Sequence, residues 1–226
     1  MIKFACFCPH APILIDEDDL SFKNEEIKET VSGIVKLRGC FEEENYDLVL
    51  VSSPHPEWGV EIPLRALYKD SGNIGQIFNY QEASKVEIEE RGVYPILTSS
   101  GSIEDHFEWG RKLYRKIDKK WKVAYIASGD MSHTLKEDGP YGYDEVGVEF
   151  DERFLRYLKE KNIEGILSFD NRFLLKAGVC GIWSFGMCLG FLEETGINYQ
   201  VEILSYQAPF GVGYLVCNFI LDEERR

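Results

Sequence analysis

Hydrophobic and polar positions along the chain follow two different periods. Nearly continuous apolar runs, or a period of two, predict β-strands, whereas apolar positions every three to four residues predict α-helices. The strand-like segments are residues 2–8 (IKFACFC), 46–53 (YDLVLVSS), 74–80 (IGQIFNY), 85–90 (KVEIEE), 122–128 (KVAYIAS), 200–207 (QVEILSYQ) and 211–221 (GVGYLVCNFIL). The helix-like segments are residues 23–44, 102–118, 145–161, 162–169 and 181–195.

This alternation of strands and helices predicts an α/β fold. The chain contains no internal repeat, low-complexity tract or linker, so residues 1–226 are expected to form a single domain. Its central sheet is predicted to be mainly parallel or mixed, with helices on both faces, because the segments at 46–53 and 122–128 are almost entirely apolar. In such folds, ligands bind beyond the carboxyl ends of the strands.

Composition and charge narrow the functional classes. The 226 residues carry a formal net charge of −14, which argues against binding to nucleic acid or to an anionic membrane. No apolar run reaches the roughly 18 residues that a membrane-spanning helix needs, and the apolar N-terminus is interpreted as a strand rather than a signal peptide. The six cysteines are expected to be free thiols, which favours a cytoplasmic protein. The amount of buried helix and sheet edge also favours a homo-oligomer.

Three of the four histidines directly follow predicted buried strands. His10 follows the first strand, His55 the second buried strand and His133 the third, whereas His106 lies within a predicted helix that Ser102 caps and is expected to pack or face solvent. If the strands are parallel, the first three imidazoles meet at one edge of the sheet. His10 and His55 each have a proline on both sides, in CPHAP and SPHPEW. Prolines restrict the backbone, which would help to hold a metal ligand in a fixed position. An ordinary proline-rich turn would have the same sequence pattern.

An ordered set of motifs carries a family resemblance. The stretches are PHAPIL (9–14), SPHPEW (53–58), SGDMSH (128–133), GPYGYDEVGVEFD (139–151) and APFGVGY (208–214). Together they resemble the class III extradiol ring-cleavage dioxygenase superfamily, the family of the protocatechuate 4,5-dioxygenase catalytic subunit. The resemblance is strongest to its Memo-like and AmmeMemoRadiSam-associated branches.

The resemblance implies a metal-dependent oxidoreductase. It assigns His10 and His55 as ligands of Fe(II), His133 as the acid/base residue, and Asp130 as the residue that holds or orients the loop of His133. A facial set of two histidines and one carboxylate leaves positions on iron for a catechol-like aromatic substrate and O2. A histidine can accept the phenolic proton, because its pKa lies near neutrality. From the residues alone, Asp130 could equally serve as a helix N-cap or in an Asx-turn.

One position departs from the family pattern. Related sequences often read Ala-Gly-Glu-Cys-Gly where this chain reads AGVCG, so Val179 stands in place of the expected carboxylate. The resemblance to the Memo-like branch then makes Cys180 the third ligand, and a thiolate shifts the preference from iron towards Zn2+ or copper. The alternative is that Cys180 is a small buried apolar residue.

Several further interpretations remain open from the sequence. Cys6, Cys8 and His10 alternate along one strand and could form a separate metal site, although a packed core strand explains the two cysteines better. Tyr141 and Tyr143 could line a pocket or serve in packing. No sequence pattern of a serine hydrolase or a P-loop is present. Three functions therefore compete: a dioxygenase-type enzyme, a Memo-like relative with a metal or redox site or a pocket for a peptide or small molecule, and a metal-free interaction module.

Overall fold

The computed structural model describes residues 1–16, 19–21, 23–68, 78–79, 91–98 and 101–222. Its centre is a seven-stranded mixed sheet. In spatial order the strands are β5 (Phe78–Asn79), β6 (Gly92–Leu97), β4 (Leu48–Ser53), β7 (Val123–Ser128), β1 (Ile2–Cys8), β9 (Tyr214–Leu221) and β8 (Tyr199–Gln207). The first five are parallel, and β9 and β8 each run antiparallel to the preceding neighbour.

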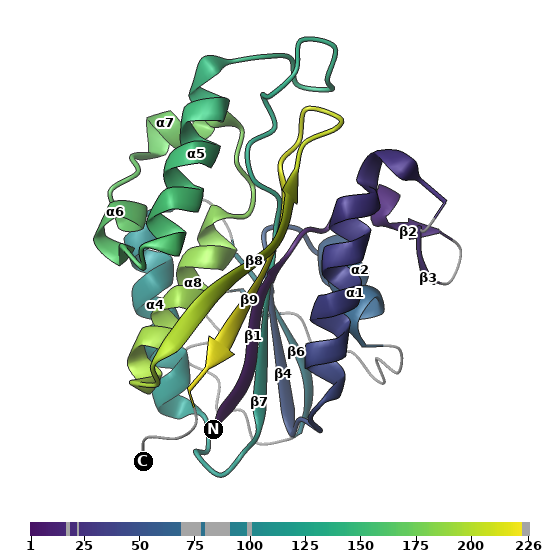
Figure 1. Cartoon of the computed structure of the whole chain (residues 1–226). Helices are drawn as coiled ribbons and strands as arrows, with labels where there is room; N and C mark the ends of the chain where they lie inside the picture. The colour runs from purple at the N-terminus through teal and green to yellow at the C-terminus, as the bar shows by residue number, and fades with distance from the viewer. Residues whose placement is uncertain (17–18, 22, 69–77, 80–90, 99–100, 223–226) are drawn as a thin grey trace.

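Helices cover both faces of this sheet (Figure 1). On one face lie α1 (Lys28–Glu42) and α2 (Trp58–Leu67). The other face carries α4 (Ile103–Lys116), α5 (Glu145–Lys159), α6 (Ile163–Leu167), α7 (Asn171–Ala177) and α8 (Ile182–Thr195). Two 3₁₀ turns, Pro12–Leu14 and Glu25–Ile27, and a two-stranded sheet of β2 (Ile15–Asp16) and β3 (Asp19–Leu20) complete the described elements. The predicted α/β fold, with a mixed sheet between two helical layers, is confirmed.

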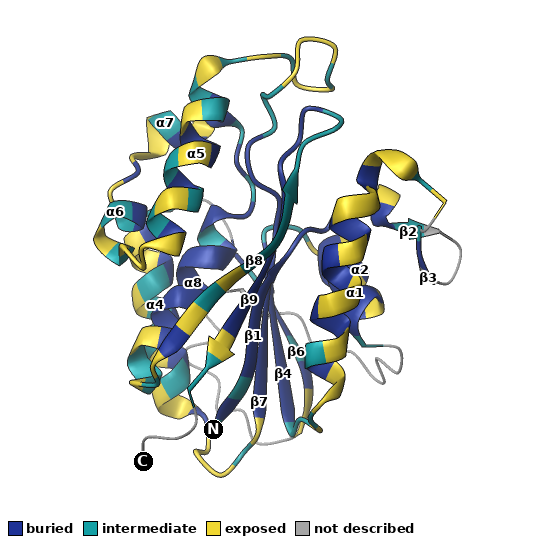
Figure 2. Ribbon diagram, in the orientation of Figure 1, coloured by how far each residue is buried: buried dark blue, intermediate teal, exposed yellow. Residues whose placement is uncertain are grey.

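The sheet separates two apolar cores, because its central strands are buried on both faces (Figure 2). Residues of α4, α5 and α8 pack on one face, where the stacked rings of Phe7 and Phe185 lie 4.3 Å apart between centroids. Residues of α1 and α2 pack on the other. Burial on both faces explains why these strands read as continuous apolar runs.

Most of the predicted elements are present, with some differences. The hydroxyl of Ser102 accepts a hydrogen bond from the backbone N–H of Asp105 at 3.0 Å, so the predicted N-cap of α4 is confirmed. The helices α2 and α7, the strand β6 and the short strands β2 and β3 are not among the expected elements. Of the strand expected at residues 74–80, the structure describes residues 78–79, which form β5. The strand expected at residues 85–90 lies outside the described residues. No described helix is long and apolar enough to cross a membrane.

The parallel strands end at the same edge of the sheet, and this alignment places the candidate site. Cys8 at the end of β1 is paired in register with Ser128 at the end of β7. Next to them, Ser52 of β4 pairs with Ala127 of β7. The loops that leave β1, β4 and β7 therefore begin side by side.

Candidate metal centre

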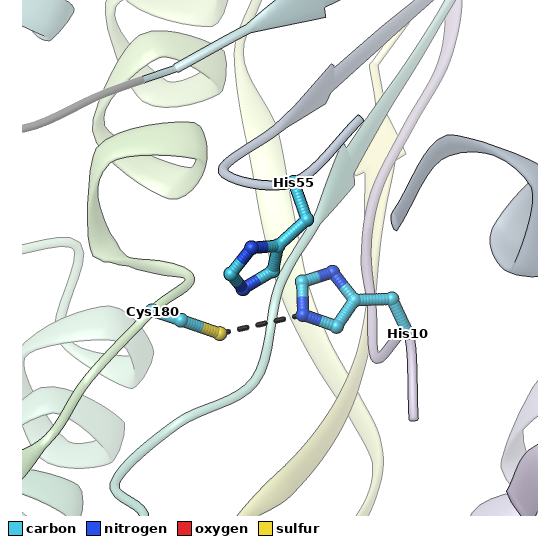
Figure 3. Close-up of side chains that lie close together, drawn as sticks. All are labelled: His10, His55 and Cys180. Atoms are coloured by element: carbon cyan, nitrogen blue, oxygen red, sulfur yellow. Dashed lines mark hydrogen bonds between the residues drawn. The ribbon is translucent and has the colours of Figure 1, made fainter. Parts of the chain in front are cut away.

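Two histidines and a cysteine from three separate loops converge above this edge. His10 follows β1, His55 follows β4, and Cys180 directly precedes the N-cap residue of α8. One ligand atom from each lies within 4.8 Å of the others. Nε2 of His10 and Sγ of Cys180 are 3.4 Å apart (Figure 3).

This spacing fits the coordination of one cation. An imidazole nitrogen binds Zn2+ at about 2.0–2.1 Å and a thiolate sulfur at about 2.3 Å, so a nitrogen and a sulfur that bind one such ion lie roughly 3.1–3.6 Å apart. The 3.4 Å between the His10 nitrogen and the Cys180 sulfur falls within that range. Imidazole and thiolate are donors that suit zinc, copper and iron. The residues present therefore fit a single transition-metal ion.

The proton on His10 is positioned by a hydroxyl at the end of β7. Nδ1 of His10 lies 2.9 Å from Oγ of Ser128, and the Ser128 hydroxyl donates its own hydrogen to the carbonyl of Gly59. Because that hydrogen is already used, Ser128 can only accept from the ring, and Nδ1 carries the proton. Nε2 then keeps its lone pair and faces Cys180, as a metal ligand requires.

A proline in α2 explains why the Gly59 carbonyl is available to Ser128. In an α-helix, the N–H four residues later bonds this carbonyl, and that position is Pro63, which has no N–H. The Ser128 hydroxyl takes the place of the missing donor. A side chain at position 59 would also collide with Ser53, so only glycine allows α2 to approach the ends of the strands so closely.

Cys180 is brought to the site by two close backbone approaches. α7 is followed by its C-cap Gly178, whose left-handed backbone (φ 68°) turns the chain towards Cys180. The N–H of Asp130 then donates to Sγ of Cys180 at 3.3 Å, and the N–H of Gly181 donates to the Asp130 carbonyl at 2.9 Å. A Cβ atom on Gly129 would overlap the backbone of Gly181, so both loops depend on glycine at this contact.

His133 lies beside this group with its ring held in one tautomer. Its Nδ1 is 3.0 Å from the carbonyl of Met131, which can only accept, so Nδ1 carries the proton and the neutral ring has its lone pair on Nε2. The backbone N–H of His133 and the hydroxyl of Ser132 both donate to the carbonyl of Ala177, at 3.1 and 2.7 Å. The loops of His133 and Cys180 are thereby joined at their base.

Asp130 is buried and contacts His10. Its Oδ1 accepts the backbone N–H of His10 at 3.1 Å, and its Oδ2 lies 3.8 Å from Nε2 of the same residue. The Asp130 carboxylate thus holds the loop of His10. Its role in holding the loop of His133 stays a prediction. A ligand atom of Asp130 also lies within 4.8 Å of one on His133 and of the Cys180 sulfur.

The electrostatics of these groups suit a bound cation. Burial, followed by the charges of His55 and His133, lowers the pKa of His10 to about 3, so this imidazole is neutral at pH 7. Burial, followed by the Asp130 charge, raises the pKa of the Cys180 thiol, and burial raises the pKa of Asp130 to about 7. A cation reverses the last two shifts, because it stabilises the thiolate and the carboxylate directly.

Two exposed aromatic rings flank the group. The indole of Trp58 stacks on His55 with ring centroids 4.6 Å apart and meets His10 edge-on at 4.9 Å. Tyr141, which is 66% exposed, meets His133 edge-on at 5.0 Å. Glu57, between His55 and Trp58, adopts a positive φ of 55°, a strained conformation for a residue with a side chain. This turn folds the indole back over the histidine.

The remaining candidates from the sequence lie elsewhere. Cys6 and Cys8 are buried in the apolar core on the α1 side, and among the described residues neither belongs to a group spaced to hold a metal. His106 is fully buried in α4. Val179 packs in the other apolar core, so the position at which related sequences carry a carboxylate is part of the protein interior. All six cysteines are free.

The chain matches a known protein family over most of its length. The model of the catalytic LigB subunit of aromatic ring-opening dioxygenase matches residues 40–217. The chain belongs to the LigB family. The match includes His55, Asp130, His133 and Cys180, whereas His10 lies before its first residue. LigB-type proteins typically use a metal, in agreement with the presence of His/Cys groups that could hold one. The Memo-like branch assignment stays a prediction.

Two individual proteins extend this comparison. A protein of Clostridium acetobutylicum is 51% identical over 109 residues, which make up 48% of this chain and 23% of that protein. The chain thus covers about a quarter of the curated relative that it matches. The crystal structure of an uncharacterized protein from Escherichia coli K12 aligns with 96% of this chain and 99% of its own, at a TM-score of 0.54 and 14% identity. That likeness supports the LigB-type fold alone.

Proposed function

We propose that this LigB-family protein is a metal-dependent oxidoreductase that uses Fe(II) and O2 to open the ring of a small catechol-like aromatic. His10, His55 and Cys180 would hold the ion. The observation that carries the proposal is the convergence of these three ligands within 4.8 Å of one another, with His133 beside them. When bound, Fe(II) supplies the positions at which a diol and O2 can react together. Both oxygen atoms enter the product, so no external reductant is consumed.

The proton chemistry is assigned to His133. Burial lowers the pKa of this imidazole, which keeps the ring neutral at pH 7. Its lone pair is on Nε2, because Nδ1 donates its hydrogen to the Met131 carbonyl. A catechol that approaches the ion brings its hydroxyls next to this ring. His133 would accept one phenolic proton and later return it to the product.

Trp58 and Tyr141 would form the walls of the substrate site. Trp58 contacts His10 and His55, and Tyr141 contacts His133. Both rings are partly open to solvent, at 39% and 66% exposure. Flat aromatic surfaces bind other aromatic rings through stacking and edge-to-face contacts. The two rings therefore favour a planar aromatic over an extended aliphatic substrate.

A second function is favoured by one specific observation. The residue beside His10 and His55 at this turn is the thiol of Cys180, and residue 179 supplies no carboxylate, because it is a valine packed in the core. A donor set of two imidazoles and a thiolate suits Zn2+ and copper as well as iron. The alternative is therefore a Memo-like protein with a metal or redox site, or a small-molecule or peptide pocket, that opens no aromatic ring.

Anaerobic purification followed by metal analysis and oxygen uptake tests these functions. The proposal predicts one tightly bound iron per chain after reconstitution with Fe(II), and oxygen consumption with at least one catechol of a panel. The His10→Ala variant should lose the iron. The His133→Gln variant should keep it and lose oxygen uptake, whereas the control His106→Gln should keep both. One bound metal without oxygen uptake on any catechol would support the alternative, and a wild type that binds no metal would contradict both.

A further inference from the structure

A second group of metal-ligating side chains lies next to the first. One ligand atom each from Asp130, His133 and Cys180 lies within 4.8 Å of the other two. The two groups share Cys180 and otherwise use different residues. Such an arrangement resembles a pair of cation sites that meet at a common ligand, as in sites where two metal ions lie about 3.5–4 Å apart.

Each member of the second group has a lone pair that can bind a cation. His133 has its lone pair on Nε2, because Nδ1 is committed to the Met131 carbonyl at 3.0 Å. Asp130 uses Oδ1 to accept the His10 backbone N–H, and its other oxygen lies 3.8 Å from the His10 ring. The Cys180 sulfur accepts the Asp130 N–H at 3.3 Å, and a thiolate has further lone pairs with which to join two ions.

We propose that a second divalent cation binds to Asp130, His133 and Cys180, with the Cys180 thiolate between the two ions. The inference rests on the proposed function, because the first ion is the one held by His10, His55 and the same thiolate. A single divalent ion is neutralised by one thiolate and one carboxylate. The second ion adds two uncompensated positive charges to a poorly hydrated site, so it binds more weakly than the first.

This second ion has a functional consequence. It occupies the Nε2 lone pair with which His133 would accept a phenolic proton. It also occupies the Asp130 carboxylate, which otherwise compensates the charge of the first ion. Excess divalent metal is therefore expected to inhibit the reaction proposed above, through a defined site and not through general precipitation or displacement of the first ion.

Zn2+ titration of the full-length protein tests the inference without any assay of activity. Isothermal titration calorimetry, combined with metal analysis after equilibrium dialysis, should give two Zn2+ per wild-type chain, the second bound about tenfold or more weakly than the first. The Asp130→Asn and His133→Gln variants should each bind one. Asparagine at position 130 retains an oxygen to accept the His10 N–H, and circular dichroism verifies the fold of both variants.

Matched controls separate the outcomes. The Cys40→Ser variant removes a half-buried thiol beside Asn218 and should still bind two Zn2+. One equivalent in the wild type would overturn the inference and leave the proposed function standing. Two equivalents that survive in both Asp130→Asn and His133→Gln would also overturn it, because the second ion would then bind elsewhere. No Zn2+ or Fe2+ binding at all would instead contradict the proposed function.

Discussion

The Nε2 atom of His10 lies 3.4 Å from the Sγ atom of Cys180, although 170 positions separate the two residues in the chain. This contact depends on the parallel ends of β1 and β7 and on the turn that leads from α7 into α8. It joins the first loop of the protein to one of its last.

Ser128 is expected to control metal affinity although it is not itself a ligand. Ser128→Ala removes the acceptor that keeps the proton of His10 on Nδ1. Loss of such a supporting hydrogen bond typically weakens metal binding by about 10–100-fold. Competition with a chromophoric chelator measures this affinity. The control is Ser52→Ala, because Ser52 is also buried near the end of a strand but bonds Ser184 at 2.7 Å. Equal affinities for both variants would contradict the role of Ser128.

Val179→Glu tests whether the family carboxylate can simply be restored. The valine is 6% exposed and packs in the core that contains Phe150 and Ile182. A carboxylate forced into this core is expected to lower the free energy of unfolding by about 3 kcal/mol or more. Urea denaturation measures that loss, with Val179→Leu as the control for added volume. A Val179→Glu protein of normal stability that binds Fe(II) more tightly would show that the position reaches the metal.

Asp151 of α5 is expected to make stability depend on pH. It is buried, accepts the Ser132 N–H at 2.9 Å and accepts the hydroxyl of Tyr206. Burial raises its pKa to about 7, with these two hydrogen bonds acting in the opposite direction. A carboxyl group with a raised pKa in the folded state contributes stability below pH 4, and this contribution is lost as the pH rises to about 7.

The corresponding measurement is the free energy of unfolding from pH 4 to pH 8. The wild type should lose up to about 4 kcal/mol over this range relative to Asp151→Asn, which cannot titrate. The comparison of the two proteins cancels the other titrating groups, including Asp130. Parallel stability profiles for the wild type and the variant would refute the assignment.

The aromatic walls predict a selective loss of ligand binding. Trp58→Leu and Tyr141→Ala should each weaken binding of 4-methylcatechol by about three- to tenfold, which is equivalent to roughly 1 kcal/mol for one aromatic contact. Calorimetry on metal-loaded protein in the absence of O2 provides the measurement. Tyr143→Ala is the matched control, because Tyr143 is 54% exposed and lies two residues from Tyr141. If Tyr143→Ala weakened binding as much as Trp58→Leu and Tyr141→Ala, the results would contradict a specific contact between Tyr141 and the ligand.

The sequence predicted the layers of the fold because its strands are long and apolar and its amphipathic helices have clear periods. It did not predict α2, because Gly59 and Pro63 both lower helix propensity. In the structure these two residues are what allow α2 to pack against β7 and offer a carbonyl to Ser128. The strand β6 was missed for a similar reason, because Pro95 in its sequence is unfavourable in the interior of a sheet. In both elements, tertiary packing outweighed local preference.

The residues of the site differ in how far the sequence alone could predict them. His10, His55 and His133 follow apolar runs, and parallel strands bring such positions together whatever their separation along the chain. Cys180 came from the family resemblance, since nothing local distinguishes it from a packed cysteine. The link from Ser128 to Gly59 and the tautomer of His10 required coordinates, because they depend on hydrogen bonds between distant segments.

X-ray absorption at the iron edge of the Fe(II)-loaded protein tests the central claim most directly. The account predicts one sulfur ligand and nitrogen ligands at a shorter distance from the iron, with the sulfur signal absent in Cys180→Ser. A wild-type spectrum with nitrogen and oxygen neighbours alone, or a sulfur signal that persists in the variant, would contradict the assignment of His10, His55 and Cys180 as the ligands.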